Sequence, residues 1–360
     1  MFLRRVYLQS SKNVLSTVKY EVNSDMHIQI IAEAGVNHNG ELVLAKELAL
    51  KAKEAGADVV KYQTFVPERL ASSAAKKAEY QEKNTGEGSQ LDMLRKLSLD
   101  FDAFRELKRF CEEIGIQFLS TPFDLASIDF LQDLGMPFWK IPSGEMTNLP
   151  YLERIAASGM PVVLSTGMST LEEVGAALSL LRRNGAGDIT LLHCTTQYPT
   201  PFEDVNLRAM DTLRERFGLP VGYSDHTKGI TVPIAAAARG ACVIEKHFTL
   251  DRNMKGPDHK ASLEPDALRA MVCAVREVEL SLGDGVKTPK ALEIANMAVA
   301  RKSIVAASPI AKGTVLTADM LTTKRPGTGI SPMRWYEVIG KQADKDYAAD
   351  EALNRTLLEN

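Results

Sequence analysis

The chain has 360 residues, of which 45% are hydrophobic and 25% are charged, and its formal net charge is -3. Acidic and basic residues are mixed along the chain, so the sequence gives no indication of a nucleic-acid partner. The longest apolar runs, such as "VPIAAAA" at 232–238, are too short to span a membrane.

Residues 1–26 are interpreted as an N-terminal tail. They lack the apolar core of about 7–15 residues that a signal peptide carries. Their Arg and Ser residues give some likeness to an organelle transit peptide, but the amphipathic pattern is weak. The four cysteines of the chain show no CxxC spacing and lie in apolar segments, which is typical of reduced, buried thiols and predicts a cytoplasmic protein.

From residue 28 onward, short runs rich in Val, Ile, Leu or aromatic residues alternate with segments of helical period that end at Gly or Asn. The runs are 28–35, 59–65, 116–123, 138–144, 161–168, 189–196, 221–227 and 242–250. Strands that alternate with helices indicate parallel βαβ units, and eight of them in about 255 residues predict a (β/α)8 TIM barrel over 27–284. An open doubly wound sheet is the alternative, although no GxGxxG motif follows the first run.

Nearly every run ends in polar side chains that can do chemistry. In "IEKHFTLD" at 244–251, for example, Glu245, Lys246 and His247 follow directly on an apolar segment. The catalytic groups of TIM barrels lie at the C-terminal ends of the strands. Because such clusters recur at the same end of the predicted strands, we expect an active site there.

His226 and His247 end two successive predicted strands. Neighbouring strands lie about 4.8 Å apart, so the two imidazoles can reach one metal ion. With Glu33 and Asp258 nearby and positions left open for water and substrate, the pattern suits a catalytic Mn²⁺, Mg²⁺ or Fe²⁺ ion rather than a structural zinc. The alternative is that both histidines bond only to the backbone.

Lys61 and Lys140 end the second and fourth predicted strands, and Ser143 and Ser165 follow the fourth and fifth. Two ammonium groups with hydroxyls and loop N–H groups at a barrel mouth predict a phosphate site. A second enzyme class is also open, in which Lys61, Lys140 or Lys246 forms a Schiff base as in class I aldolases. Ordinary salt bridges at the top of the barrel are the third possibility.

The sequence changes character after the barrel. Residues 285–299 are interpreted as a linker with a helical middle, and the short strands, turns and prolines of 300–360 predict a small β-rich domain. At about 60 residues the module is near the lower size for independent folding, so we expect it to pack on another surface. Its segment "KRPGTGISP" at 324–332 presents Arg325 on a stiff Pro-Gly loop. A binding protein that uses this module on a carbohydrate or ice surface is a further alternative, which the reactive strand ends argue against.

Taken together, these residues resemble the sialic acid synthase family. The motifs that carry the resemblance are "IAEAGVNHNG", "KYQTF", "AEYQEKNTG", "STPFD", "KIPSGE", "LSTGM", "HCTTQYPTPFEDVNL", "GYSDHT", "EKHFTLD", "GPDHKASLEP" and "KRPGTGISP". The C-terminal module resembles the antifreeze-like (SAF, β-clip) domain of these enzymes. The resemblance implies a transferase that condenses phosphoenolpyruvate with an N-acetylated mannosamine-type sugar and water and releases phosphate by C–O cleavage. It also implies a domain-swapped homodimer.

The resemblance assigns roles to residues that match the family's motifs. It implies that His226 and His247 bind Mn²⁺ or Mg²⁺, that Glu33 is the acid/base group, and that His247 also belongs to the catalytic set. The residues that would hold phosphoenolpyruvate are Lys61, Thr121, Lys140, Ser143, Ser165 and Ser224. The residues that would hold the sugar are Gln63, Glu145, Tyr198, Asp258 and Arg325, the last from the other subunit.

One position separates two possible sugars. Thr196 in "HCTT" stands where many N-acetylneuraminate synthases have Asn, and relatives that make legionaminic acid carry the same replacement. The first expectation is N-acetylmannosamine as the substrate, which gives N-acetylneuraminate. The alternative is 2,4-diacetamido-2,4,6-trideoxymannose, which gives N,N'-diacetyllegionaminate.

Overall fold

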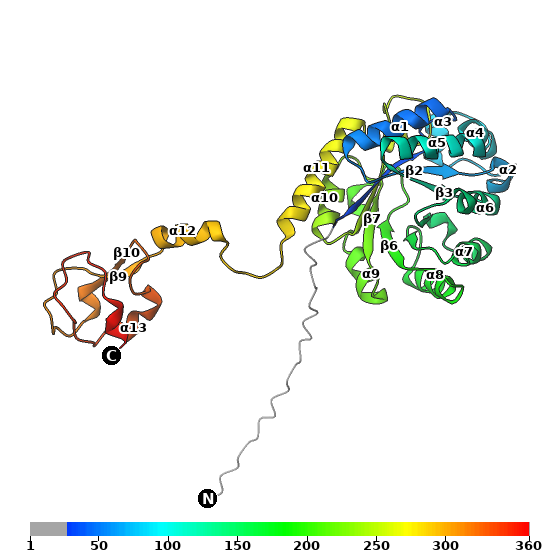
Figure 1. Cartoon of the computed structure of the whole chain (residues 1–360). Helices are drawn as coiled ribbons and strands as arrows, with labels where there is room; N and C mark the ends of the chain where they lie inside the picture. The colour runs from blue at the N-terminus through cyan, green and yellow to red at the C-terminus, as the bar shows by residue number, and fades with distance from the viewer. Residues whose placement is uncertain (1–26, 360) are drawn as a thin grey trace, which may run out of the picture. The chain divides into compact units, whose positions relative to one another are not determined.

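The computed structural model describes residues 27–359, so the expected tail at 1–26 lies outside the described residues. Eight strands form one parallel sheet: β1 Gln29–Gly35, β2 Val59–Thr64, β3 Gln117–Pro122, β4 Trp139–Ile141, β5 Val162–Ser165, β6 Ile189–Cys194, β7 Val221–Asp225 and β8 Val243–His247. Their hydrogen-bonded order is β3-β2-β1-β8-β7-β6-β5-β4. The two end strands, β3 and β4, still contact each other, so the sheet curls into a nearly closed barrel (Figure 1). The predicted TIM barrel is confirmed.

Helices surround the strands, as Figure 1 shows. They are α1 Leu42–Ala55, α5 Phe101–Ile114, α6 Leu125–Leu134, α7 Leu149–Ala156, α8 Leu171–Arg183, α9 Ala209–Phe217, α10 Thr231–Ala238 and α11 Pro265–Leu282. One connection is longer than a single helix. Between β2 and α5 lie three short helices, α2 Pro67–Leu70, α3 Glu79–Thr85 and α4 Gln90–Leu97, and we call residues 65–100 the β2–α5 insertion.

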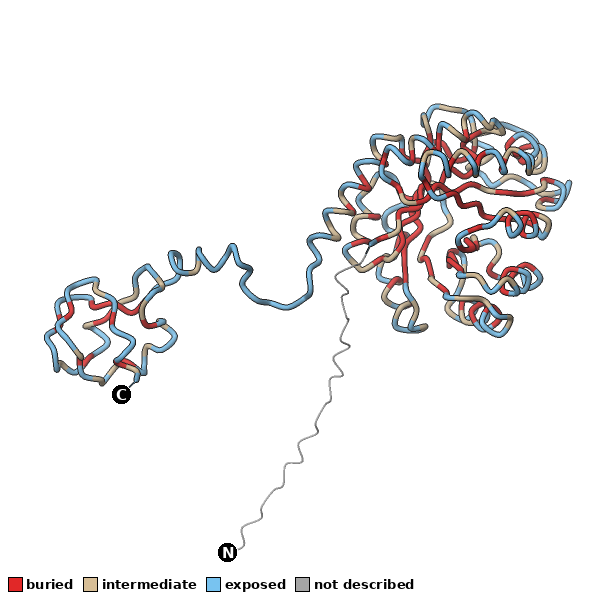
Figure 2. The backbone as a smooth tube through the Cα atoms, viewed as in Figure 1, coloured by how far each residue is buried: buried red, intermediate tan, exposed pale blue. Residues whose placement is uncertain are grey.

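The strands form because they offer apolar side chains to both faces. In β1 every residue from Ile30 to Gly35 is buried, and the same holds along the whole of β5, β7 and β8. Such strands belong in a sheet covered on both sides. Figure 2 shows the buried residues concentrated on the strands and on the inner faces of the helices.

Local signals in the sequence set where helices begin and end. Thr170 caps α8, because its hydroxyl accepts from the Glu173 N–H while the Glu173 carboxylate accepts from the Thr170 N–H. The helix α1 ends at Gly56, whose φ of 85° is a conformation that glycine adopts at low cost. These stops return the chain to the next strand, so all eight strands present their C-terminal ends at one rim.

The chain divides into two compact units, the first ending at Asp284 and the second beginning at Gly285. The second unit opens with α12, Ala291–Ala300, which covers the later part of the predicted linker at 285–299 and ends one residue beyond it. It continues with the antiparallel strands β9 Ser303–Ala306 and β10 Leu321–Lys324, short helices such as α13 Trp335–Val338, and isolated bridges. Its own apolar core is built from Ile304, Ile310, Leu316, Leu321, Ile330, Val338, Tyr347, Leu353 and neighbours. Across residues 27–359, no helix combines the length and apolar character that crossing a membrane requires.

Candidate active site

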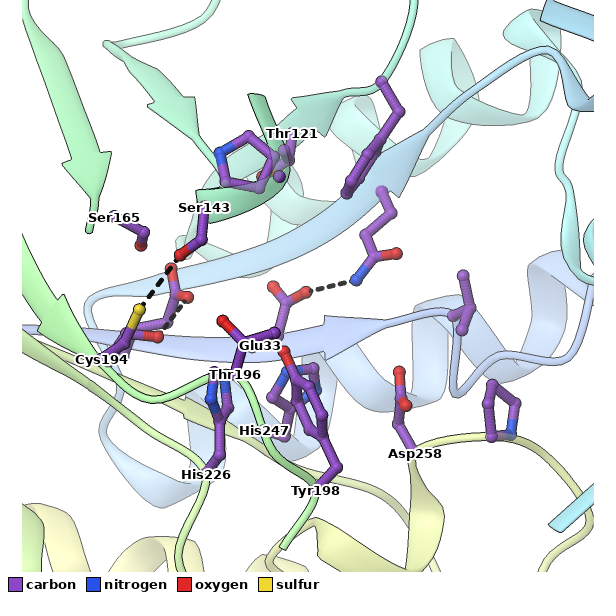
Figure 3. Close-up of a pocket in the computed structure, with 18 of the residues that line it drawn as sticks. Glu33, Thr121, Ser143, Ser165, Cys194, Thr196, Tyr198, His226, His247 and Asp258 are labelled. Carbon is purple, nitrogen blue, oxygen red and sulfur yellow. Dashed lines mark hydrogen bonds between the residues drawn. The ribbon is translucent and has the colours of Figure 1, made fainter. Parts of the chain in front are cut away.

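A cavity of about 300 Å³ opens at the C-terminal rim of the barrel. Its lining contains most of the predicted site: Glu33, Lys61, Gln63, Thr121, Lys140, Ser143, Ser165, Tyr198, Ser224, His226, His247 and Asp258. These residues come from all eight strands or from the loops that directly follow them. Figure 3 shows the labelled side chains turned toward a common space.

The alternation of side chains along a strand decides which residues of the "EKH" cluster reach this cavity. Glu245 and His247 line it, whereas Lys246 between them does not, because successive strand residues point to opposite faces. Lys246 instead donates to the carboxylate of Asp225 and to the carbonyl oxygen of Thr227. Of the three lysines considered for a Schiff base, Lys246 is therefore excluded from the cavity.

Two buried lysines make one side of the cavity cationic. The Lys61 Nζ lies 2.5 Å from Glu33 Oε2 and donates to Thr121 Oγ1 at 3.1 Å. The Lys140 Nζ donates to Ser165 Oγ at 2.8 Å. Burial lowers the pKa of Lys140, whereas Glu245 and Glu33 raise the pKa of Lys61 in spite of its burial. Converging ammonium and hydroxyl groups of this kind suit a phosphate-bearing substrate.

Glu245 belongs to the site although the predicted set of site residues omits it. Its Oε2 lies 3.6 Å from Lys140 Nζ and 3.9 Å from Lys61 Nζ, and its Oε1 accepts from Ser224 Oγ at 2.9 Å. Burial acts to raise the pKa of Glu245, but Lys140 and Lys61 outweigh it and lower the pKa to about 2. The carboxylate therefore stays ionised between the two lysines. Its place two residues before His247, on the same face of β8, was the signal that could have found it.

The pKa of Glu33 is shifted in the opposite direction from that of Glu245. Burial raises the pKa of the Glu33 carboxyl group, and the attraction of Lys61 offsets this only in part. Gln63 Nε2 donates to Glu33 Oε1 at 2.9 Å, which fixes the plane of the carboxyl group. A carboxyl group whose pKa is raised by burial holds a proton more readily than a free carboxyl group, which suits the predicted acid/base role.

The two histidines lie together, with ring centroids 5.5 Å apart. The His226 Nδ1 donates to the carbonyl oxygen of Thr195 at 2.6 Å. Its Nε2 therefore carries the lone pair that can bind a metal ion. The Nδ1 of His247 is buried and has no hydrogen-bond partner among the described residues. Burial lowers the pKa of both rings, so both are neutral at neutral pH, as metal ligands must be.

These imidazoles fit an open metal site. Within residues 27–359, no group of three or more His, Cys, Asp or Glu side chains comes together as a metal site, so two imidazoles are what the protein offers here. A divalent ion held this way keeps positions for water and substrate oxygen atoms, which Mn²⁺ and Mg²⁺ favour.

Aromatic rings and an acid form the outer side of the cavity. Tyr198 packs against His226 at 4.2 Å between ring centroids, and Tyr80 of α3 stacks on Tyr198 at 5.2 Å. Burial and the nearby Glu33 raise the pKa of Asp258 to about 7. Tyr80 and Gln81 line the cavity from the β2–α5 insertion, and the prediction had named neither. The quoted motif "AEYQEKNTG" contains both and was the available signal.

Two predicted residues do not line the cavity. Glu145 ends a short 3-10 helix, Ser143–Glu145, where its carboxylate accepts from Asn148 Nδ2 at 2.6 Å. Arg325 is exposed in the second unit, directly after β10. Their roles toward the sugar stay predictions.

The fold and the site together define an enzyme of the TIM-barrel class with a polar, charge-balanced mouth and a small C-terminal domain. A model of the NeuB family matches residues 48–287, and a model of the SAF domain matches residues 301–358. The chain belongs to the NeuB family. The predicted family and the predicted SAF domain are thereby confirmed.

Individual relatives match over most of their length. The chain is 54% identical to the N,N'-diacetyllegionaminic acid synthase of Campylobacter jejuni, over 90% of this chain and 98% of that one. It is 38% identical to the human N-acetylneuraminate-9-phosphate synthase, over 92% of each chain. The crystal structure of an N-acetylneuraminic acid synthetase from Leptospira borgpetersenii, in complex with citrate, is 34% identical with a TM-score of 0.66, covering 75% of this chain and 90% of that chain.

Proposed function

We propose that this protein is a nonulosonate synthase that condenses phosphoenolpyruvate with an acetamido sugar and water, and releases phosphate. The observation that carries the proposal is the single cavity in which two buried lysines, two neutral imidazoles and the raised-pKa carboxyl group of Glu33 meet. A phosphate-bearing substrate bound there would lie within reach of both the metal ion and the acid/base group.

Phosphoenolpyruvate would lie on the cationic side. Lys61 and Lys140 supply charge, and Thr121, Ser143, Ser165 and Ser224 supply hydroxyls to its phosphate and carboxylate oxygen atoms. The phosphate brings negative charge into a cavity where burial lowers the pKa of Lys140, so binding favours the protonated ammonium group. Fixed charges placed by the barrel strands would stabilise the charge that develops on the departing phosphate.

The reaction forms a bond between C3 of phosphoenolpyruvate and C1 of the open-chain sugar, whose aldehyde oxygen takes up a proton and becomes a hydroxyl. Water then adds to C2 and gives up a proton. The C2–O bond to phosphate breaks next, which leaves a 2-keto acid and inorganic phosphate. A Mn²⁺ or Mg²⁺ ion held by His226 and His247 would supply Lewis acidity at the aldehyde oxygen. Glu33 would move the protons, and Gln63 keeps its carboxyl group in place.

Isotope labelling tests the bond that breaks. Phosphoenolpyruvate with ¹⁸O in its bridging position should transfer the label to inorganic phosphate, because the C–O bond is cleaved. Mass spectrometry of both products measures this, with unlabelled substrate as the control. Label retained in the sugar acid would mean P–O cleavage and would contradict the proposed function.

The two candidate sugars are not equally supported. The 54% identity to a named N,N'-diacetyllegionaminic acid synthase, with the Thr196 replacement in the cavity lining, supports 2,4-diacetamido-2,4,6-trideoxymannose over N-acetylmannosamine, which was the first expectation. Tyr198, Asp258 and Gln63, which line the cavity, would contact the sugar. Product analysis with both sugars at equal concentration decides between them.

The proposal includes a cytoplasmic homodimer in which each small domain completes the partner's site. Its support is α12, in which no residue is buried and three large apolar side chains are exposed, Leu292 at 88%, Ile294 at 59% and Val299 at 69%. Exposed apolar side chains gathered on one short helix mark a surface that another surface covers, and a second copy of this chain would provide one. The four free cysteines support a reducing compartment.

Arg325 would contact the sugar in the partner's barrel, since its guanidinium offers five donors in a rigid fork. Replacing Arg325 by Ala should lower kcat/KM by about 10- to 100-fold, because charged hydrogen bonds contribute about 1.5–3 kcal/mol. Mixing Arg325→Ala chains with His247→Ala chains tests the crossing. A hybrid dimer then has one intact barrel facing an intact arginine only if the arginine reaches across, so activity should appear in the mixture. A mixture with proven hybrids that stays as inactive as its parents would refute the exchange.

A further inference from the structure

Three rows of residues pair across β7 and β8 at the rim of the barrel. The register places Ser224 opposite Glu245 and Asp225 opposite Lys246, and His226 and His247 follow one step later. The first and third rows line the cavity, whereas the middle row points away from it. The two imidazoles therefore each follow directly on one member of a buried acid–base pair.

The middle row forms a closed network. Asp225 and Lys246 are both 0% exposed, and the Lys246 Nζ donates to Asp225 Oδ2. The same Nζ donates to the carbonyl oxygen of Thr227 at 2.5 Å. Asp225 also accepts from the Thr227 N–H at 3.1 Å, from the Thr227 hydroxyl at 3.0 Å and from the Tyr223 hydroxyl at 3.1 Å. Both carboxylate oxygen atoms are thus occupied.

This network fixes the backbone on both sides of His226. Asp225 precedes the histidine and Thr227 follows it, and both are tied to Lys246, which precedes His247. The carbonyl oxygen of His226 accepts from Thr200 N at 2.9 Å, and that of His247 accepts from Leu263 N at 2.9 Å. The main-chain placement of each imidazole is therefore set by bonds that lie outside the cavity.

Stability alone does not account for the pair. Two charges taken out of water carry a desolvation cost that their attraction often only balances, and well-packed neutral replacements of such pairs are often neutral or stabilising. A buried pair placed directly behind two metal-binding side chains instead suits the outer-shell role that orients ligands.

We propose that Asp225 and Lys246, with Thr227, are positioning residues that hold His226 and His247 in the spacing and orientation needed to bind one divalent ion. The inference rests on the metal site of the proposed function. It extends that site to residues that neither line the cavity nor contact substrate.

The test compares the affinity for Mn²⁺ alone in full-length variants, read from the electron paramagnetic resonance signal of free Mn²⁺. The double variant Asp225→Asn/Lys246→Met removes both charges while keeping similar side-chain volumes, so it should fold. Its Kd for Mn²⁺ should rise by about 10- to 100-fold, as for other outer-shell changes. The bound-ion spectrum should broaden, because the two imidazoles lose their common orientation.

A matched control is the pair Asp58 and Arg276, where Arg276 Nη2 donates to Asp58 Oδ2 at 2.8 Å at the N-terminal end of β2. Asp58→Asn/Arg276→Met removes an ion pair whose side chains are each 27% exposed and that lies away from the histidines, so its Kd for Mn²⁺ should match that of the wild type. Thermal unfolding of both double variants separates an effect on stability from an effect on binding.

Wild-type affinity in a folded Asp225→Asn/Lys246→Met variant, within about threefold, would overturn the positioning role. If that variant does not fold, Thr227→Val removes one hydroxyl bond to Asp225 and should weaken Mn²⁺ binding several-fold; unchanged affinity there would overturn the role equally. A wild-type protein that binds Mn²⁺ no better than His247→Ala would instead refute the metal site itself.

Discussion

Treatment with a chelator should abolish condensation, and added Mn²⁺ should restore it. Replacing His247 by Ala should have the same effect without rescue, because one of the two imidazoles at the site is lost. A Lewis acid contributes several kcal/mol to a transition state of this kind, so the rate should fall by about 10²- to 10³-fold or more. Phosphate release from phosphoenolpyruvate in the presence of the sugar measures the effect.

His247→Ala should leave the fold intact, since the ring lies at the rim with its Nδ1 unpaired among the described residues rather than within the packed layers of the barrel. The exposed His27, near the opposite end of β1, provides the matched control, and His27→Ala should retain full activity. Full turnover by a metal-free wild-type sample would contradict the assignment of His226 and His247 as ligands of a catalytic metal ion.

Replacing Lys61 by Met should damage both stability and catalysis. Glu33 and Glu245 would then share the cavity with one cation fewer, and removing one partner of a buried ion pair costs about 3–5 kcal/mol in the free energy of unfolding. The loss of a charge that, in the proposed function, would contact the phosphate should lower kcat/KM by about 10²- to 10³-fold. Thermal unfolding measures the loss of stability, steady-state kinetics measures the loss of kcat/KM, and calorimetry measures the affinity for phosphoenolpyruvate, which should also fall.

A second variant separates the two effects. Glu33→Gln/Lys61→Met removes the unpaired carboxylate as well, so it should regain much of the lost stability and none of the activity. At the surface, Lys46→Met breaks a pair with Glu106 whose side chains are 29% and 49% exposed, and it should cost less than about 1 kcal/mol. Unchanged binding of phosphoenolpyruvate by Lys61→Met would show that the substrate lies elsewhere.

The sequence predicted the barrel well because its signal is repeated. Each strand is short, begins with an apolar run and is followed by a helical period, so an error in one unit does not change the architecture. The chain near Glu145 shows the limit of the method. The sequence predicted one strand over 138–144, but the strand ends at Ile141 and a 3-10 helix begins at Ser143. Glu145, at the end of this helix, does not line the cavity.

The site was predicted less completely for two physical reasons. Glu245 was visible in the cluster with Lys246 and His247, but only strict alternation along β8 tells which of the three face inward. Tyr80 lies on α3, a seven-residue helix with no buried residue. No periodic pattern of apolar residues could therefore predict that Tyr80 faces the cavity. What places Tyr80 is stacking on Tyr198, a contact between residues distant in the chain.

The β2–α5 insertion has a consequence for how this scaffold can change its sugar. Tyr80, Gln81, Met93, Leu94 and Leu97 reach the cavity from short helices outside the barrel wall, whereas the charged groups stand on or directly after strands. Substitutions in the insertion can reshape the outer wall without shifting the register of any strand pair. We therefore expect an exchange of this segment between relatives to change the sugar that is accepted while the charged groups on the strands stay in place.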